Sequence, residues 1–66
     1  MDIRYPNVTV PLIGQNGNAF FIIGRVNKAL KKAGIDNSVI DEFTEDAMSG
    51  DYNHVLTTTM KWVNVE

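Results

Sequence analysis

A short polar loop near the start of the chain has residue types that suit the binding of an anion. Residues 14–18 read Gly-Gln-Asn-Gly-Asn, and an apolar run begins directly after them. If a helix starts there, its first backbone N–H groups have no partner inside the helix and attract negative charge. Gly14 and Gly17 also allow a phosphate to approach the backbone closely. An ordinary strand-to-helix turn is the favoured interpretation of the loop alone, and an anion site is the alternative. The loop residues that we expect to contact the anion are Gln15, Asn16, Gly17 and Asn18.

This loop does not match either of two common phosphate-binding loops. A P-loop carries Lys and then Ser or Thr directly after its last glycine, and both are missing after Gly17. A dinucleotide-binding fingerprint has three glycines at a spacing different from that of Gly14, Gly17 and Gly24.

Basic and aromatic side chains extend the candidate site. Arg25, Lys28 and Lys32 would share one face of a helix, and Arg25 is placed to reach a phosphate at the helix start. A solvated basic face that the acids of the next segment balance is the favoured interpretation of these residues, and the phosphate contact is the alternative. Phe20 and Phe21 would point about 100° apart, so one core contact can hardly take both. We assign Phe20 and Arg25 to the ligand site. A helix start that is buried all round is the alternative for the two Phe rings.

Other residues whose types could take part in binding or catalysis have simpler interpretations. Trp62 and Tyr52 could stack on a base, but packing in the core is the favoured interpretation. His54, three positions after a predicted helix N-cap at Asp51, is interpreted as a surface or capping residue. No serine has an adjacent base with an orienting group. We therefore expect no catalytic residue, no metal site and no cofactor.

A cluster of acids in the second half of the chain could be mistaken for an acid/base pair. Glu42, Glu45 and Asp46 would share a helix face largely opposite the apolar stripe, so we expect them to be exposed and unperturbed. Residues 36–51 carry six acids and no base, whereas residues 19–35 carry four bases and no acid.

Composition narrows the class of protein. The chain has no Cys and one His, which excludes disulfides and thiolate metal sites. Its net charge of −2 argues against nucleic-acid binding, and a transcription factor is further disfavoured because no basic recognition helix is evident. No apolar run approaches the roughly 18 residues of a membrane span, and no signal peptide is evident. We expect a cytoplasmic protein.

The length predicts a single domain over residues 1–66. A domain of this size buries only about 60% of its unfolded surface, and its core usually needs a disulfide, a metal or a partner chain. The 44% hydrophobic content is enough for a core and an interface. We therefore expect a homodimer.

The elements that must position the site follow from the spacing of apolar residues. Residues 8–13 predict a strand, which Pro11 makes an edge strand or a bulged one. Residues 19–33 have helical spacing, with Asn18 as N-cap and Gly34 as terminator. A hairpin that turns at Asn16-Gly17 is the competing interpretation, and the sustained helical period decides against it.

The second half of the chain completes an α+β domain. A helix is expected over residues 38–49, capped by Asp36 or Asn37, and a third begins after Asp51. The run Thr57-Thr58-Thr59 leaves a strand open as the alternative there. Residues 62–66 alternate and could pair with the first strand. The predicted order is β-α-α-α-β, with three short helices packed on a two-stranded β-ribbon.

The segments "GQNGNAFFIIGRVNKALKKAG", "DEFTEDAMSGDY" and "MKWVNVE" resemble a group of short hypothetical proteins from phages and prophages of Gram-positive bacteria. The resemblance covers nearly the whole chain and implies no particular activity. It implies a setting, the cytoplasm of an infected bacterium. Some small phage proteins there sequester nucleotide-derived immune signals, and others block host defence proteins directly.

Two functions follow as expectations. The favoured one is a non-enzymatic anti-defence protein, a homodimer that sequesters a small cyclic nucleotide or a ligand of the cyclic ADP-ribose type. The alternative is a protein-interaction module that inhibits a host defence protein through its acidic or apolar helix face.

Overall fold

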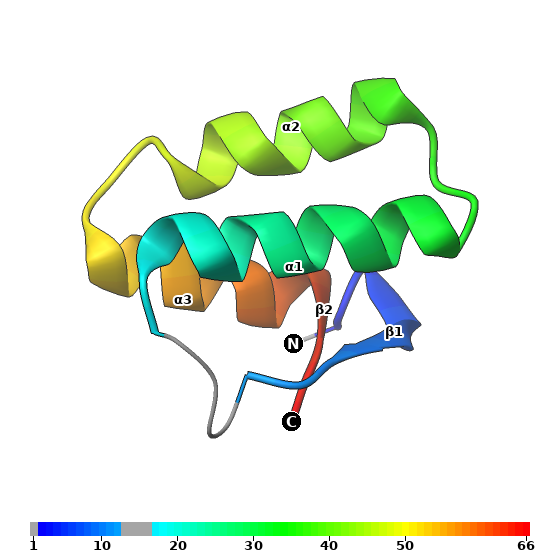
Figure 1. Cartoon of the computed structure of the whole chain (residues 1–66), viewed down its shortest axis with the longest axis horizontal. Helices are drawn as coiled ribbons and strands as arrows, with labels where there is room; N and C mark the ends of the chain where they lie inside the picture. The colour runs from blue at the N-terminus through cyan, green and yellow to red at the C-terminus, as the bar shows by residue number, and fades with distance from the viewer. Residues whose placement is uncertain (1, 13–16) are drawn as a thin grey trace.

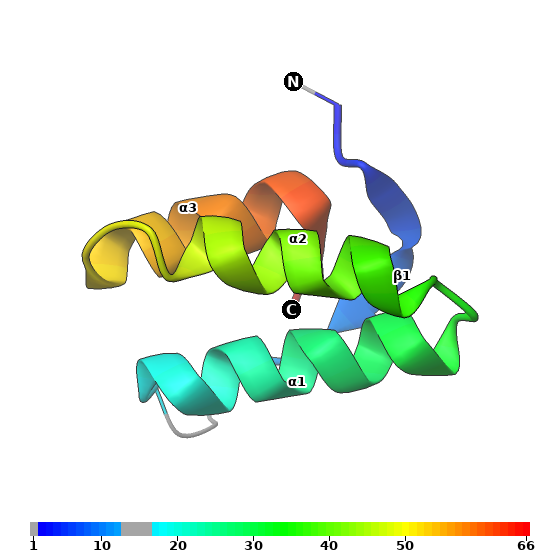
Figure 2. The same ribbon diagram turned by 90° about the horizontal axis from the view of Figure 1, so that it is seen from above.

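Three helices pack beside a two-stranded parallel sheet in the computed structural model, which describes residues 2–12 and 17–66 (Figure 1). The order of elements confirms the predicted β-α-α-α-β arrangement. The elements are β1 (Tyr5–Val10), α1 (Ala19–Lys32), α2 (Asn37–Ala47), α3 (Tyr52–Trp62) and β2 (Val63–Val65). Seen from above, α1 and α2 run side by side and α3 lies partly behind α2 (Figure 2). No helix in the described part of the chain is long and apolar enough to cross a bilayer.

β1 begins and ends earlier than the sequence predicts. The strand covers Tyr5–Val10 and stops before Pro11, which has no N–H for a ladder. The sheet register pairs Tyr5 with Val63 but Thr9 with Asn64, so β1 carries an irregularity between these two pairs. This irregularity is not at Pro11, where the sequence placed a possible bulge, because Pro11 follows the last residue of the strand. The side-chain amide of Asn64 donates to the carbonyl oxygen of Pro6 and bridges the interruption.

The predicted ends of α1 are confirmed. The Asn18 side chain accepts the Phe20 N–H at 2.8 Å, and this gives the helix its N-cap. At the other end, Gly34 has a φ of 84°, and the Ile35 N–H donates to the Leu30 carbonyl at 3.0 Å. This is the bonding pattern of a helix that ends on a left-handed glycine.

α3 is helical through its three threonines, so the strand alternative for this segment is wrong. The hydroxyls of Thr57 and Thr59 donate to the carbonyl oxygens four residues earlier, at 2.9 and 2.8 Å. These bonds satisfy the hydroxyl groups inside the helix. They also allow Thr59 to be fully buried. The strand begins only at Val63.

The core lies where the three helices meet the sheet. Its buried apolar side chains come from all five elements, and the fully buried ones include Val10, Val26, Leu30, Phe43 and Val63. Trp62 packs edge-on against Phe43, with ring centroids 5.4 Å apart, and this confirms its predicted place in the core. The guanidinium carbon of Arg4 lies 4.2 Å from the centre of the Trp62 ring and covers its outer face.

Candidate functional site

The outward face of α1 carries an open groove with an aromatic end and a basic end. The groove has a volume of about 570 Å³ and is lined by Phe20, Phe21, Gly24, Arg25 and Lys28. These residues fall on one side of the helix because 3.6 residues make a turn. The buried residues of α1, such as Ile22 and Val26, occupy the opposite side.

Both phenylalanines of this groove are exposed. Phe20 has 72% of its surface accessible and Phe21 has 55%, so a helix start buried all round is wrong for this chain. Gly24, which follows in the groove, has open space where a Cβ would stand. The floor of the groove is therefore helix backbone, and a flat ring can approach it closely.

The described lining of the groove contains two cations and no acid. Arg25 is half-buried and Lys28 is exposed, and neither Asp nor Glu occurs between residues 19 and 35. A guanidinium and an ammonium on one helix face attract anions such as phosphate. The predicted combination of Phe20 and Arg25 is thus present in one groove. Sequence reasoning left Phe21, Gly24 and Lys28 out of the site.

The described part of the polar loop serves the fold. The Phe20 N–H, one of the groups that an anion site at the helix start would use, already donates to Asn18. The carbonyl oxygen of Gly17 accepts the hydroxyl of Tyr52. Gln15 and Asn16 lie outside the described residues. Of the loop residues assigned to the ligand, Gly17 and Asn18 therefore have structural partners.

The acids of α2 are exposed as expected, and one of them has an unanticipated partner. Glu42 accepts a hydrogen bond from the Arg4 guanidinium at 3.1 Å. The guanidinium over Trp62 is charged at every physiological pH, as arginine side chains are, and this bond raises the pKa of Arg4 further. The base that meets Glu42 thus comes from the N-terminal segment and not, as the solvated-face interpretation expected, from α1.

A Ser, a His and an Asp meet at the end of α2, and their geometry is that of a helix cap. His54 Nε2 lies 2.8 Å from the carbonyl oxygen of Asp46 and 3.1 Å from Ser49 Oγ. A carbonyl only accepts, so Nε2 donates to it. A nucleophilic triad needs its carboxylate on the other ring nitrogen, but the Asp46 carboxylate approaches the same Nε2, at 3.5 Å. His54 is therefore a capping residue, as one of its two interpretations expected.

A second groove runs beside β2. It has a volume of about 670 Å³, and its apolar lining includes Ile3, Met60, Val63 and Val65. Among the described residues that line it, Lys61 is the one basic side chain and Asp2 is present as well, so this lining has fewer basic side chains than that of the α1 groove. The chemistry of an aromatic anion fits the α1 groove better.

Searches among protein-family models, curated proteins and solved structures returned no match to this chain. The interpretation of the α1 groove rests on its own geometry.

Proposed function

We propose that this protein is a non-enzymatic binding protein that sequesters a small nucleotide-derived ligand. One observation carries the proposal: two exposed aromatic rings and two cations share one acid-free groove on α1. A nucleotide joins a flat base to a phosphate. The Phe rings can stack on the base, and Arg25 and Lys28 can bind the phosphate.

The affinity that sequestration needs implies a second wall for the groove. Nanomolar binding corresponds to about −12 kcal/mol, and sites of that quality bury about 70–90% of a small ligand. A groove on one face of a single helix encloses much less. The proposed binding unit is therefore a homodimer, with the ligand between two copies.

The resemblance to phage and prophage proteins motivates the proposed biological role. A cyclic nucleotide or a cyclic ADP-ribose type molecule combines the base and phosphates that the groove suits. Such molecules are immune signals in infected bacteria, so sequestration would be an anti-defence activity.

A second candidate function is direct inhibition of a host defence protein. The observation that favours it is the exposed acidic face of α2, which includes Asp41, Glu45 and Asp46. This face could dock on a basic groove of another protein. Replacing Glu45 should abolish this activity and leave nucleotide binding intact, whereas replacing Arg25 should do the reverse.

Thermal unfolding against a ligand panel tests the proposal. The panel contains cyclic di- and trinucleotides, cyclic ADP-ribose isomers and NAD. A ligand at about 100 times its Kd stabilises the protein by roughly 2.7 kcal/mol, which for a domain this small means an upward shift on the order of 10 °C or more.

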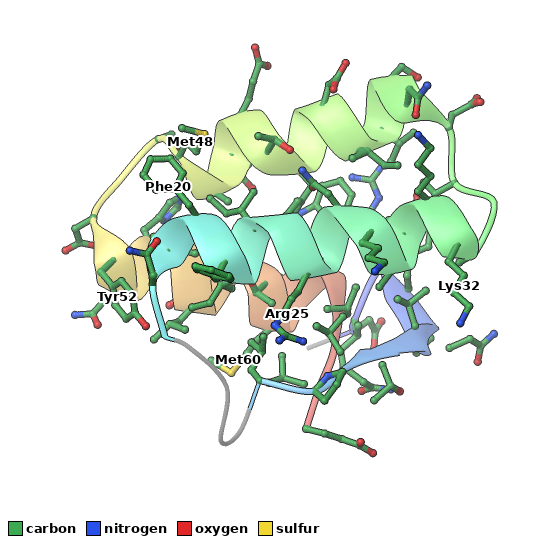
Figure 3. All side chains as sticks on the ribbon, in the orientation of Figure 1. Phe20, Arg25, Lys32, Met48, Tyr52 and Met60 are labelled. Atoms are coloured by element: carbon green, nitrogen blue, oxygen red, sulfur yellow. The ribbon has the colours of Figure 1, made fainter. Side chains whose placement is uncertain are left out.

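Three variants make this test specific to the groove. Arg25→Ala and Lys28→Ala should each abolish most of the ligand-induced shift. Lys32→Ala removes the same charge from the opposite end of α1, outside the groove, and should preserve it (Figure 3). A panel without any shift, or equal losses in all three variants, would contradict the proposed site.

A further inference from the structure

We infer that the protein self-associates through the end of the helix bundle at which α1 starts. The surface consists of Phe20, Phe21, Met48 and Tyr52 and is called the bundle-end surface below. These are four of the six large hydrophobic side chains that are exposed in the described part of the chain. Figure 3 shows Phe20 and Met48 next to each other there, with Tyr52 at the start of α3.

The bundle-end surface is continuous. Phe20, Met48 and Tyr52 line one hollow of about 210 Å³, although they come from α1, the end of α2 and α3. Phe20 also lines the α1 groove, where its neighbour is Phe21. Single exposed apolar residues are ordinary on a monomer, but a contiguous cluster indicates an interaction site.

Its area suits a dimer. The exposed fractions are 72% for Phe20, 55% for Phe21, 54% for Met48 and 45% for Tyr52. With about 200 Å² for a large side chain, they give roughly 450 Å² per copy, or about 900 Å² for two copies. Homodimer interfaces are about 65% apolar, so about 900 Å² of buried apolar surface implies a total buried area of about 1,400 Å² for the dimer. Stable interfaces bury about 1,200–2,000 Å².

The shape of this surface is complementary to itself. Phe20 stands out from the bundle end, and directly beside it is a hollow that its own ring helps to line. In a dimer with a two-fold axis, the Phe20 ring of each copy can enter the hollow of the other. The two contacts are equivalent because both copies use the same surface.

The charges at the rim also fit a second copy. Asp51 lies at the hollow, whereas Arg25 and Lys28 lie beyond Phe21 along the α1 groove. A rim that carries both positive and negative charges is complementary to a second copy with the same charges. It is less complementary to a polymer that carries charges of one sign.

Self-association at this surface would supply the second wall of the ligand groove, and this step rests on the proposed function. Phe20 borders both the hollow and the α1 groove. A copy docked on the bundle end therefore lies against the aromatic end of that groove. Phe20 enters the partner's hollow in this arrangement, so Phe21 is the ring that would stack on the base. The ligand would contact residues from both copies.

Two methionines provide a matched test, because Met48 is 54% exposed and Met60 is 56% exposed. Met48 belongs to the bundle-end surface, and Met60 lines the groove beside β2. The variants Met48→Gln and Met60→Gln remove similar apolar surface. Met48 is the C-cap that follows α2, and Met60 lies inside α3, where Gln has nearly the helix propensity of Met. Sedimentation velocity of the ligand-free protein, from about 1 to 500 µM, gives the dimer Kd of each.

We expect Met48→Gln to raise the dimer Kd at least about tenfold and Met60→Gln to change it less than about twofold. Phe20→Gln should act like Met48→Gln. A wild-type protein that stays monomeric throughout would overturn the inference. So would equal weakening by both Met variants, or weakening by Met60→Gln alone, which would move the interface to the groove beside β2.

The outcomes for self-association and for the ligand are separable. Arg25→Ala should weaken the dimer far less than Met48→Gln does, because a charge at the rim acts mainly on the rate of association, whereas it should lose most of the ligand-induced stabilisation. A dimer that is sensitive to Met48→Gln but binds nothing in the nucleotide panel would support this interface and contradict the proposed function.

Discussion

The hydroxyl of Tyr52 donates to the carbonyl oxygen of Gly17 and so connects the start of α3 to the residue before the N-cap of α1. The two residues are 35 positions apart in the sequence. The aromatic end of the candidate groove lies beside this contact, because Phe20 and Tyr52 line the same hollow. The bond therefore helps to fix the helix start from which Phe20 projects.

Removing that hydroxyl should lower stability without changing the fold. Tyr52→Phe loses one hydrogen bond, which contributes about 0.5–1.5 kcal/mol. For a domain of this size the melting temperature should fall by about 4–8 °C per kcal/mol. Thermal unfolding followed by circular dichroism measures the change, and an unaltered melting temperature would show that the bond is not formed in solution.

Gly17→Ala should interact with this substitution. A Cβ at Gly17 would stand 3.1 Å from the Tyr52 hydroxyl oxygen, which is a tight contact. The Ala variant should therefore cost more stability in the wild type than in Tyr52→Phe, where that oxygen is gone. A double-mutant cycle measures the difference. Strictly additive effects would contradict the contact.

Substitution by Ala should cost much more stability at Phe43 than at Phe20. Phe43 is fully buried against Trp62, so Phe43→Ala should cost about 3–5 kcal/mol and unfold much of the protein at room temperature. Phe20→Ala should change monomer stability by about 0.5 kcal/mol or less, since Phe20 is largely exposed. Urea denaturation at low protein concentration compares them. Comparable losses would contradict this assignment of core and surface.

Gly24→Ala should raise the stability of the protein and weaken its ligand binding. A Cβ there meets open space, and Ala is favoured over Gly inside a helix by about 1 kcal/mol. Gly24→Ala should therefore raise the melting temperature. It also narrows the floor of the α1 groove, so the ligand-induced shift should shrink. An Ala variant that is more stable and binds the ligand equally well would remove Gly24 from the site.

Arg4 should stay over Trp62 across the physiological pH range. Glu42 raises the Arg4 pKa above an already high value. The stability that a raised basic pKa contributes is lost only as the pH rises through that value, so none is lost between about pH 6 and pH 9. Fluorescence of the single Trp should be constant over this range, and Arg4→Ala should alter it at every pH. A wild-type emission change within the range would contradict the assignment.

The sequence predicted the helices well because their ends carry strong local signals. Asn18 and Gly34 define α1, and the Asp51 side chain caps α3 by accepting the His54 N–H at 2.9 Å. The threonine run left α3 open to two interpretations. Helix propensity does not include the bonds that Thr57 and Thr59 make one turn back.

The site was only partly predictable. The prediction focused on backbone N–H groups at the helix start, and the structure shows that Asn18 takes one of them. Projecting α1 onto a helical wheel would have found Gly24 and Lys28 beside Phe20, because their spacing is local information. The hollow shared with Met48 depends on packing between helices and has no local sequence signal.

The pairing of β1 with β2 also affects the order in which this protein can fold during synthesis. The contact between Asn64 and Pro6 spans 58 positions, and the helices lie between the two strands in the chain. The helices can form early because their contacts are local. β1 has no ladder partner until the ribosome has released β2. Until then it is an unpaired strand edge, the kind of surface on which a nascent chain aggregates or meets a chaperone.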